Sequence, residues 1–332
     1  MGNRIKSLSN KTTDTALFSF LKQSFTKSKL LDFKNFKSLV FVAFLSKTQK
    51  HLQTLITILF FTLFAIIFTS CEYDADFSGL IRSTDRVEKR FEQSMQWNIQ
   101  NPYQTISISK EDYQILVAAD SHIGGMINFS YLKNLWLHED YLALVIVGDI
   151  VSGKEEDYLL FVDSIADITK PLFPIVGNHD LYFDGWKYFY KYLGSSTYYF
   201  IVETPTAKDI YLCLDSGGGT FGKSQINWLE QFLKDNRKDY RYCTIFSHVN
   251  ILRTRRTPNA NPMTEEVVYL LDLFTKNNID IVITGHDHIQ DEEVFGNTTY
   301  IILDALKDDN KNAGYGVLNI NKNDISHEFV RL

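Results

Sequence analysis

The 332-residue sequence is poor in cysteine, with only three, and these show no repeated spacing. Cys213 and Cys243 fall inside apolar, strand-like runs, so we expect two buried thiols rather than a disulfide framework. The sequence also lacks internal repeats and low-complexity tracts, while 45% of its residues are hydrophobic. These features exclude a repeat architecture and favour one large α/β domain or two smaller ones.

Acidic residues dominate most of the chain. Residues 1–70 hold ten Lys or Arg against two Asp or Glu, which leaves 24 basic and 38 acidic residues from 71 onward, a balance of −14. Such a body would repel a long polyanion, and we expect the short basic cluster of Arg253, Arg255 and Arg256 to be solvated. We therefore expect a small phosphorylated substrate and no long nucleic acid. The sequence identifies no protein partner.

The third cysteine, Cys71, ends an uncharged stretch over residues 52–70 that follows Lys47 and Lys50. A basic start, an apolar centre and then Phe-Thr-Ser-Cys resemble a bacterial lipoprotein signal, which implies lipidation of Cys71. An uncleaved transmembrane helix is the alternative, because about 20 uncharged residues also span a bilayer. Both interpretations predict a membrane-anchored protein, and the first places its body outside the cytoplasm, in the periplasm or on the cell surface. Residues 1–46 precede this signal, and one hypothesis is that translation starts near Leu45.

We divide the chain into an N-terminal extension with the signal or membrane segment (residues 1–71), a tether with a packing helix (72–110) and a catalytic domain (111–332). In the tether, Val87, Phe91 and Met95 recur at four-residue spacing and predict a helix that packs on the domain. From Tyr113 onward, strand-like runs alternate with helical stretches, which predicts mixed sheets flanked by helices. Residues 300–303, 316–320 and 325–330 predict antiparallel strands joined by hairpins.

Five segments each end an apolar run with residues that bind metals. They are Asp120-Ser-His122, Gly148-Asp149, Gly177-Asn178-His179-Asp180, Ser247-His248 and Gly285-His286-Asp-His288. The preceding runs are short and rich in β-branched or aromatic residues, as in strands buried on both faces. If these strands run the same way in one sheet, their ligands converge at one edge.

These residues predict a dinuclear metal site. The candidate ligands are Asp120, His122, Asp149, Asn178, His248, His286 and His288. They exceed the needs of one tetrahedral ion, and their nitrogen and oxygen donors suit two divalent or trivalent ions of zinc, manganese or iron. Asp149, after the longest apolar run, is the predicted bridge between the ions.

Such a site predicts hydrolytic chemistry. Water held between two cations has its pKa lowered from about 15.7 toward neutrality and supplies hydroxide as the nucleophile. His179 can then donate a proton to the leaving group, and Asp180 could hold the ring or tautomer of His179. We therefore predict catalytic roles for both residues.

In this order the motifs resemble the calcineurin-like metallophosphoesterase family, over about residues 115–332. The resemblance implies an α/β (α+β mixed) fold, a four-layer αββα sandwich of two mixed β-sheets flanked by helices, with a dinuclear metal site at the strand ends. It also implies a phosphoric ester hydrolase. By the family pattern, Asp120, His122, Asp149 and His288 hold one ion, Asp149, Asn178, His248 and His286 hold the other, and His179 is the proton donor.

Departures from related patterns narrow this prediction. Ser152 stands where a frequent form of the second motif, Gly-Asp-x-x-Asp, has its second aspartate. Purple acid phosphatases have a tyrosine at this position, so the resemblance to them fails. The Asp-Arg-Gly continuation of Ser/Thr protein phosphatases is also missing, which argues against a protein phosphatase. Two alternative functions remain: a non-catalytic metal-binding lipoprotein that retains the fold, and a nuclease on short single strands. The glycine-rich residues 215–219 predict a flexible loop.

Overall fold

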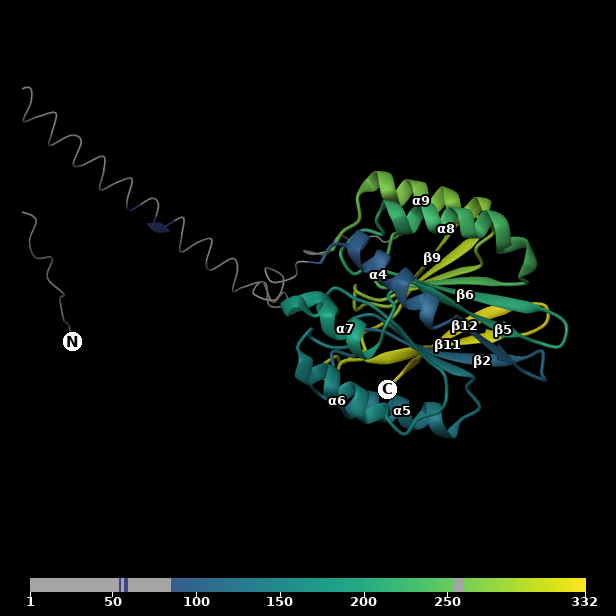
Figure 1. Ribbon diagram of the computed structural model, residues 1–332. Coiled ribbons are helices and arrows are strands. Elements are labelled where there is room, and N and C mark those ends of the chain that lie inside the picture. The colour runs from purple at the N-terminus through teal and green to yellow at the C-terminus, as the bar shows by residue number, and fades with distance from the viewer. Residues whose placement is uncertain (1–53, 55–56, 59–84, 253–259) are drawn as a thin grey trace, which may run out of the picture. The chain divides into compact units, whose positions relative to one another are not determined.

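Two mixed β-sheets form the centre of the computed structural model (Figure 1). The structure describes residues 54, 57–58, 85–252 and 260–332. The chain divides into two compact units, Met1–Tyr73 and Asp74–Leu332, and only three described residues belong to the first. Cys71 and nearly all of its signal or membrane segment lie outside the described residues. Among those that are described, no helix is long and apolar enough to cross a membrane.

The larger sheet has seven strands within residues 85–252 and 260–332. Their order across the sheet is β1 (Gln104–Ser107), β5 (Tyr198–Glu203), β6 (Lys208–Leu214), β7 (Cys243–Ser247), β8 (Ile281–Thr284), β10 (Thr298–Ile302) and β9 (Asp291–Phe295). Strands β6, β7, β8 and β10 run parallel, so their carboxyl ends share one edge of the sheet.

The smaller sheet has five strands within the same residues. Their order is β12 (Ile325–Arg331), β11 (Gly314–Ile320), β2 (Tyr113–Ala118), β3 (Ala143–Val147) and β4 (Leu172–Ile175). Strands β2, β3 and β4 are parallel, and β11 is antiparallel to both of its neighbours. Every residue of β3 is buried, as is every residue of β7. This explains the uninterrupted apolar sequence of β3, whereas β7 also buries Thr244 and Ser247.

Helices cover the outer face of each sheet (Figure 1). On the smaller sheet lie α5 (Ile127–His138), α6 (Glu155–Ile165) and α7 (Trp186–Tyr192), and on the larger sheet lie α8 (Lys223–Asn236) and α9 (Thr264–Lys276). A third apolar core fills the space between the sheets, where the rings of Phe173 and Phe200 stack with centroids 3.6 Å apart. This layering confirms the four-layer αββα sandwich.

The strand placement shows that the single-sheet condition for convergence is not met and that one predicted hairpin is wrong. The ligand-bearing strands do not share one sheet, because β2, β3 and β4 belong to the smaller sheet and β7 and β8 to the larger. Strand β10 forms no hairpin with β11 but pairs with β8 and β9 in the larger sheet, and only β11 and β12 form the predicted hairpin. Spacing along the chain cannot show which sheet a strand joins.

Helix α4 (Val87–Gln100) packs against the domain through a different face from the predicted one. Phe91 and Met95 are only half-buried. The most deeply buried positions after Val87 are polar, and they are Arg90, Ser94 and Asn98. The apolar spacing identified the helix but not its packing face. Polar side chains can be buried on that face because residues of the catalytic domain supply their hydrogen-bond partners.

Candidate metal centre

The strand ends bring all seven predicted ligands into one place. Among the described residues, two groups could each hold a metal ion, with ligand atoms within 4.8 Å of one another. The first group is Asp120, His122, Asp149 and His288, and the second is Asp149, His248 and His286. Oδ1 of Asn178 lies 3.1 Å from Nε2 of His248, which places Asn178 beside the second group. Asp149 belongs to both groups.

The backbone at these positions is strained. Five of the predicted ligands have left-handed φ values between 41° and 68°, and they are Asp120, His122, Asp149, His286 and His288. Such a conformation costs a residue other than glycine on the order of 1 kcal/mol or more, so it persists only where surrounding contacts impose it. The strand ends therefore turn sharply to aim these side chains at one point.

Gly177 lets the end of β4 approach the shared carboxylate. A Cβ atom at this position would lie 2.2 Å from Oδ1 and 2.2 Å from the backbone N of Asp149, closer than atoms can come without displacement. The next two residues use this proximity: Asn178 contributes its amide, and the backbone N–H of His179 donates to Oδ1 of Asp149 over 2.7 Å. Only glycine fits between these segments.

The two buried aspartates are held as carboxylates. Burial by itself raises the pKa of Asp149, but His248, His179 and His122 outweigh it and hold that pKa well below its usual range. Burial likewise raises the pKa of Asp120, and His288 and His248 reverse the shift, so that the pKa is lowered. Both side chains are thus charged near neutral pH, as oxygen ligands of a cation must be.

The histidines differ in charge. Burial lowers the pKa of His122 to about 4, so its ring is neutral. Burial also lowers the pKa of His248, but Asp149 and Asp120 outweigh it and raise the pKa to about 10. The pKa of His288 is raised in the same way, because Asp120 offsets the effect of burial. A proton on His248 therefore balances part of the negative charge of the two aspartates.

The donor set fits a metal ion. Nε2 of His122 is buried without a hydrogen-bond partner and lies 3.9 Å from Oδ2 of Asp149, too far for a hydrogen bond. Two ligand atoms that each lie about 2.1 Å from the same ion can be up to about 4 Å apart, so this separation leaves room for an ion between them. Nδ1 of His248 lies 3.0 Å from the backbone oxygen of Val147, which directs Nε2 toward the site.

His179 lies at the mouth of the site. Its ring is half-buried, Nε2 is 4.0 Å from Oδ2 of Asp149, and the ring centroid is 4.6 Å from that of His122. This position leaves the ring next to the predicted metal ligands and accessible to solvent.

Asp180 does not hold the ring of His179. Its Oδ1 accepts a hydrogen bond from the backbone N–H of Val151 over 2.9 Å, and Oδ2 accepts one from Gly177 over 2.8 Å. Burial and the nearby Asp149 raise the pKa of Asp180 to about 7. The residue joins the loops that follow β3 and β4, so the prediction that it orients His179 is corrected to a role in loop geometry.

Sequence reasoning missed the part played by the loop after β6. Residues 215–219 were expected to be flexible, but Asp215 and Ser216 are fully buried and hydrogen-bonded. The available signal was its position: an aspartate directly after an apolar strand, at the same edge of the fold as the ligands.

The sequence matches the calcineurin-like phosphoesterase family over residues 113–290. This match covers more than half of the chain and includes all seven predicted ligands and His179 within the fold and site described above. The chain belongs to the calcineurin-like phosphoesterase family.

Solved structures with the same fold are distant in sequence. GAP50, the anchor in the inner membrane complex of Plasmodium, is 15% identical with a TM-score of 0.53, and the match covers 67% of this chain and 85% of that one. A dimetal phosphatase from Danio rerio is 12% identical with a TM-score of 0.51, over 65% of this chain and 95% of that one. A comparison with curated proteins gave no significant match. At these identities the structural similarity shows the fold alone.

Proposed function

We propose that this protein is a metal-dependent hydrolase of phosphoester bonds in small molecules. The observation that carries the proposal is the position of Asp149, which belongs to two adjoining groups of metal ligands in a chain of the calcineurin-like phosphoesterase family. A shared carboxylate of this kind suits a pair of cations about 3.5 to 4 Å apart. When bound, such a pair neutralises the charge of a phosphoryl group and activates water as the nucleophile.

The chain's own residues then have distinct tasks. Asp120, His122, Asp149 and His288 would hold one ion, and Asp149, Asn178, His248 and His286 the other. The donor atoms are oxygen and nitrogen without sulfur, which suits manganese, zinc or iron. His179, half-buried beside this set, is the proposed acid that donates a proton from its ring to the departing oxygen of the ester.

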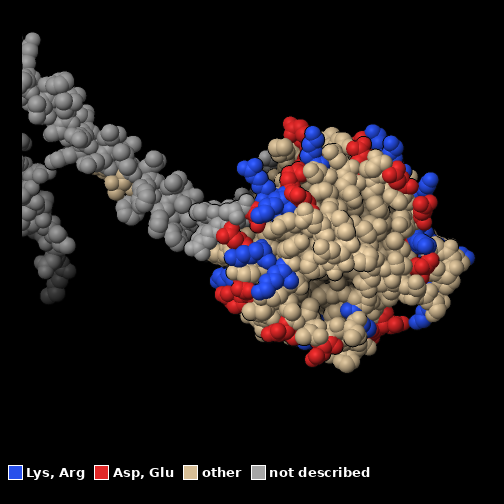
Figure 2. Space-filling view, in the orientation of Figure 1, with Lys and Arg blue, Asp and Glu red and all other residues tan. Residues whose placement is uncertain are grey.

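Surface charge supports a small substrate. On the face shown in Figure 2, basic and acidic side chains are interspersed, without a continuous basic stripe. The excess of acidic residues after residue 71 opposes binding of a long polyanion. We also propose, from the sequence around Cys71, that a lipid or an apolar segment anchors the protein at a membrane, with the catalytic domain outside the cytoplasm.

The test is hydrolysis by the purified full-length chain. The protein is freed of metal, reconstituted with manganese, zinc or iron, and assayed on an aryl phosphomonoester, an aryl phosphodiester and a pyrophosphate. We expect hydrolysis of at least one ester, its loss on chelation, and its return when metal is restored. Asp120→Ala should abolish it, whereas His138→Ala, at an exposed position on α5, should not. Metal binding without hydrolysis of any substrate would instead support the non-catalytic alternative.

A further inference from the structure

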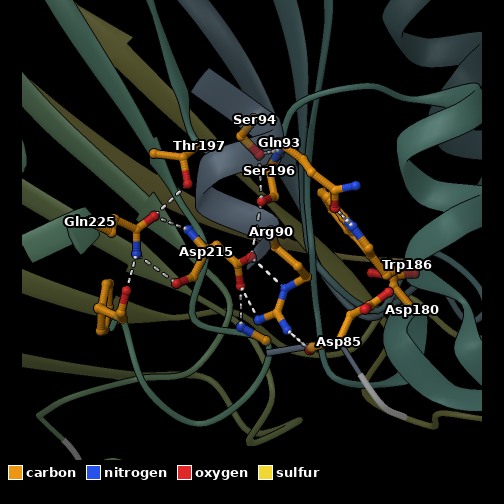
Figure 3. A network of polar contacts seen from close by, with 12 residues as sticks. Asp85, Arg90, Gln93, Ser94, Asp180, Trp186, Ser196, Thr197, Asp215 and Gln225 are labelled. Carbon is orange, nitrogen blue, oxygen red and sulfur yellow. Dashed lines mark hydrogen bonds and ion pairs between the residues drawn. The ribbon is translucent and has the colours of Figure 1, made fainter. Parts of the chain in front are cut away.

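The buried face of α4 is centred on Arg90, whose side chain is only 1% exposed. Its guanidinium group forms two parallel hydrogen bonds to the carboxylate of Asp215, from Nε to Oδ2 over 2.7 Å and from Nη2 to Oδ1 over 2.9 Å (Figure 3). Nη1 donates to the backbone oxygen of Asp85 over 2.6 Å. A bidentate pair of this kind fixes both distance and orientation. Arg90 thus joins the N-terminal helix to the loop after β6.

Both the side chain and the backbone of Asp215 are hydrogen-bonded to neighbouring residues (Figure 3). Its Oδ2 accepts a further hydrogen bond from Oγ of Ser196 over 2.9 Å, and its Oδ1 accepts one from the backbone N–H of Gly217 over 3.1 Å. The side chain of Gln225 accepts from the backbone N–H of Asp215 and donates to its backbone oxygen, over 2.9 and 2.8 Å. These bonds satisfy the buried polar groups and leave the loop a single backbone position.

The same loop touches two ligand-bearing segments. Oγ of Ser216 accepts a hydrogen bond from the backbone N–H of Val249, the residue after His248, over 2.8 Å. Gly217 packs against the residue before Asn178, because a Cβ at Gly217 would lie 2.8 Å from the backbone oxygen of Gly177. His248 and Asn178 lie together in the second group of ligands. The loop after β6 therefore contacts the neighbouring residue of each of these two ligands.

We propose that Arg90 and Asp215 are positioning residues for the half of the metal centre that contains Asn178 and His248. The proposal rests on the proposed function, since it assigns these residues to one of two metal positions. It also extends the functional unit beyond the family match, because Arg90 precedes residue 113. Loss of a group that is hydrogen-bonded directly to a metal ligand costs about 10- to 100-fold in affinity. Arg90 and Asp215 act one step further away, through the backbone of the loop after β6, so we expect a loss near the lower end of that range.

The chain offers a matched control at the opposite end of β6. Arg241 forms a second bidentate pair with Asp209, whose side chain is fully buried, and its Nε donates to Oδ1 of Asp209 over 2.9 Å. Asp209 lies near the start of β6, whereas Asp215 directly follows its end. Removal of either arginine leaves a buried carboxylate without its cationic partner, although each carboxylate keeps hydrogen bonds from neighbouring groups. Of the two arginines, Arg90 is the one whose partner lies in the loop that contacts the ligand-bearing segments.

The experiment compares metal-free full-length wild type, Arg90→Met, Arg241→Met and the double variant Arg90→Met/Asp215→Asn. Manganese is titrated calorimetrically into each, and hydrogen–deuterium exchange is measured on peptides that contain Val249. We expect wild type to bind two equivalents. In Arg90→Met, the affinity for one equivalent should fall at least about tenfold while the other changes less than about twofold. The Val249 amide should exchange faster even without metal.

The controls separate positioning from folding. Arg241→Met should keep both affinities although it loses stability. The double variant removes both charges, so it should fold even where Arg90→Met does not, yet it should still bind one equivalent weakly because the guanidinium fork is gone. Wild-type affinities in the double variant, or an equal loss in Arg241→Met, would overturn the inference. Wild type that binds no metal would instead refute the proposed function.

Discussion

Gly177→Ala tests whether catalysis depends on the close approach between the end of β4 and Asp149. The added methyl group would lie 2.2 Å from Oδ1 of Asp149, and ordinary contact begins at 3.4 Å, so the segments must separate by about 1 Å. Gly177 is not among the residues with positive φ, so the substitution adds bulk without backbone strain. The perturbation therefore acts through the position of the carboxylate.

A misplacement of about 1 Å at a reacting centre can reduce turnover about 100-fold. We expect a loss of that size in kcat for an aryl phosphate ester, together with weaker binding of both metal equivalents, since Asp149 belongs to both ligand groups. Overpacking at a buried position costs about 1 to 3 kcal/mol of folding stability, so the protein should still fold. The assay is steady-state kinetics at saturating metal, with metal content measured in parallel.

Gly124→Ala is the matched control. A Cβ at Gly124 would meet nothing closer than 3.9 Å, the backbone oxygen of His122, although the residue lies in the loop after β2 at the same site. This variant should retain activity within about twofold of wild type, as expected for a substitution without close contacts. Wild-type turnover in Gly177→Ala, or an equal loss in both variants, would refute the reasoning from steric contact.

Three further predictions concern the ligands and the proton donor. Asp149→Asn should weaken both metal equivalents, and retention of two tight equivalents in a calorimetric titration would exclude a bridging role. His179→Ala should slow esters with alkoxide leaving groups more than aryl esters, because phenolates depart with little protonation; equal losses would contradict the donor role. Since the pKa of His248 is raised to about 10 and a cation needs its neutral ring, metal binding should release a proton, and affinity should rise about tenfold per pH unit from neutrality to about pH 9. Binding that is independent of pH would disprove this.

The sequence predicted the ligands better than it predicted what holds them. Asp120, Asp149 and His248 each follow a short strand-like run, and the carboxyl ends of parallel strands meet at an edge, so their convergence could be anticipated. The distribution of the strands over two sheets could not, because a buried strand has the same apolar sequence in either sheet. Local pattern carries no information on long-range pairing.

The supporting residues were hidden for the same reason. Arg90 and Asp215 are 125 positions apart, so the sequence gives no sign that they pair. An arginine beside the apolar stripe of a helix is normally predicted to face solvent. Asp180 was assigned to its neighbour His179, yet its carboxylate is directed to the backbone of Val151 and Gly177. Adjacency in the chain is a poor guide to the direction of a side chain in a tight turn.

The distribution of the ligands over two sheets has a mechanical consequence. Any cation coordinated by Asp149 and His248 is attached to β3 of one sheet and β7 of the other, across an interface otherwise held mainly by apolar contacts. A bound cation would therefore tie the two sheets together at this end and add to the folding stability of the domain. A chelator should then lower the unfolding temperature of the metal-loaded protein as well as inhibit the proposed hydrolysis.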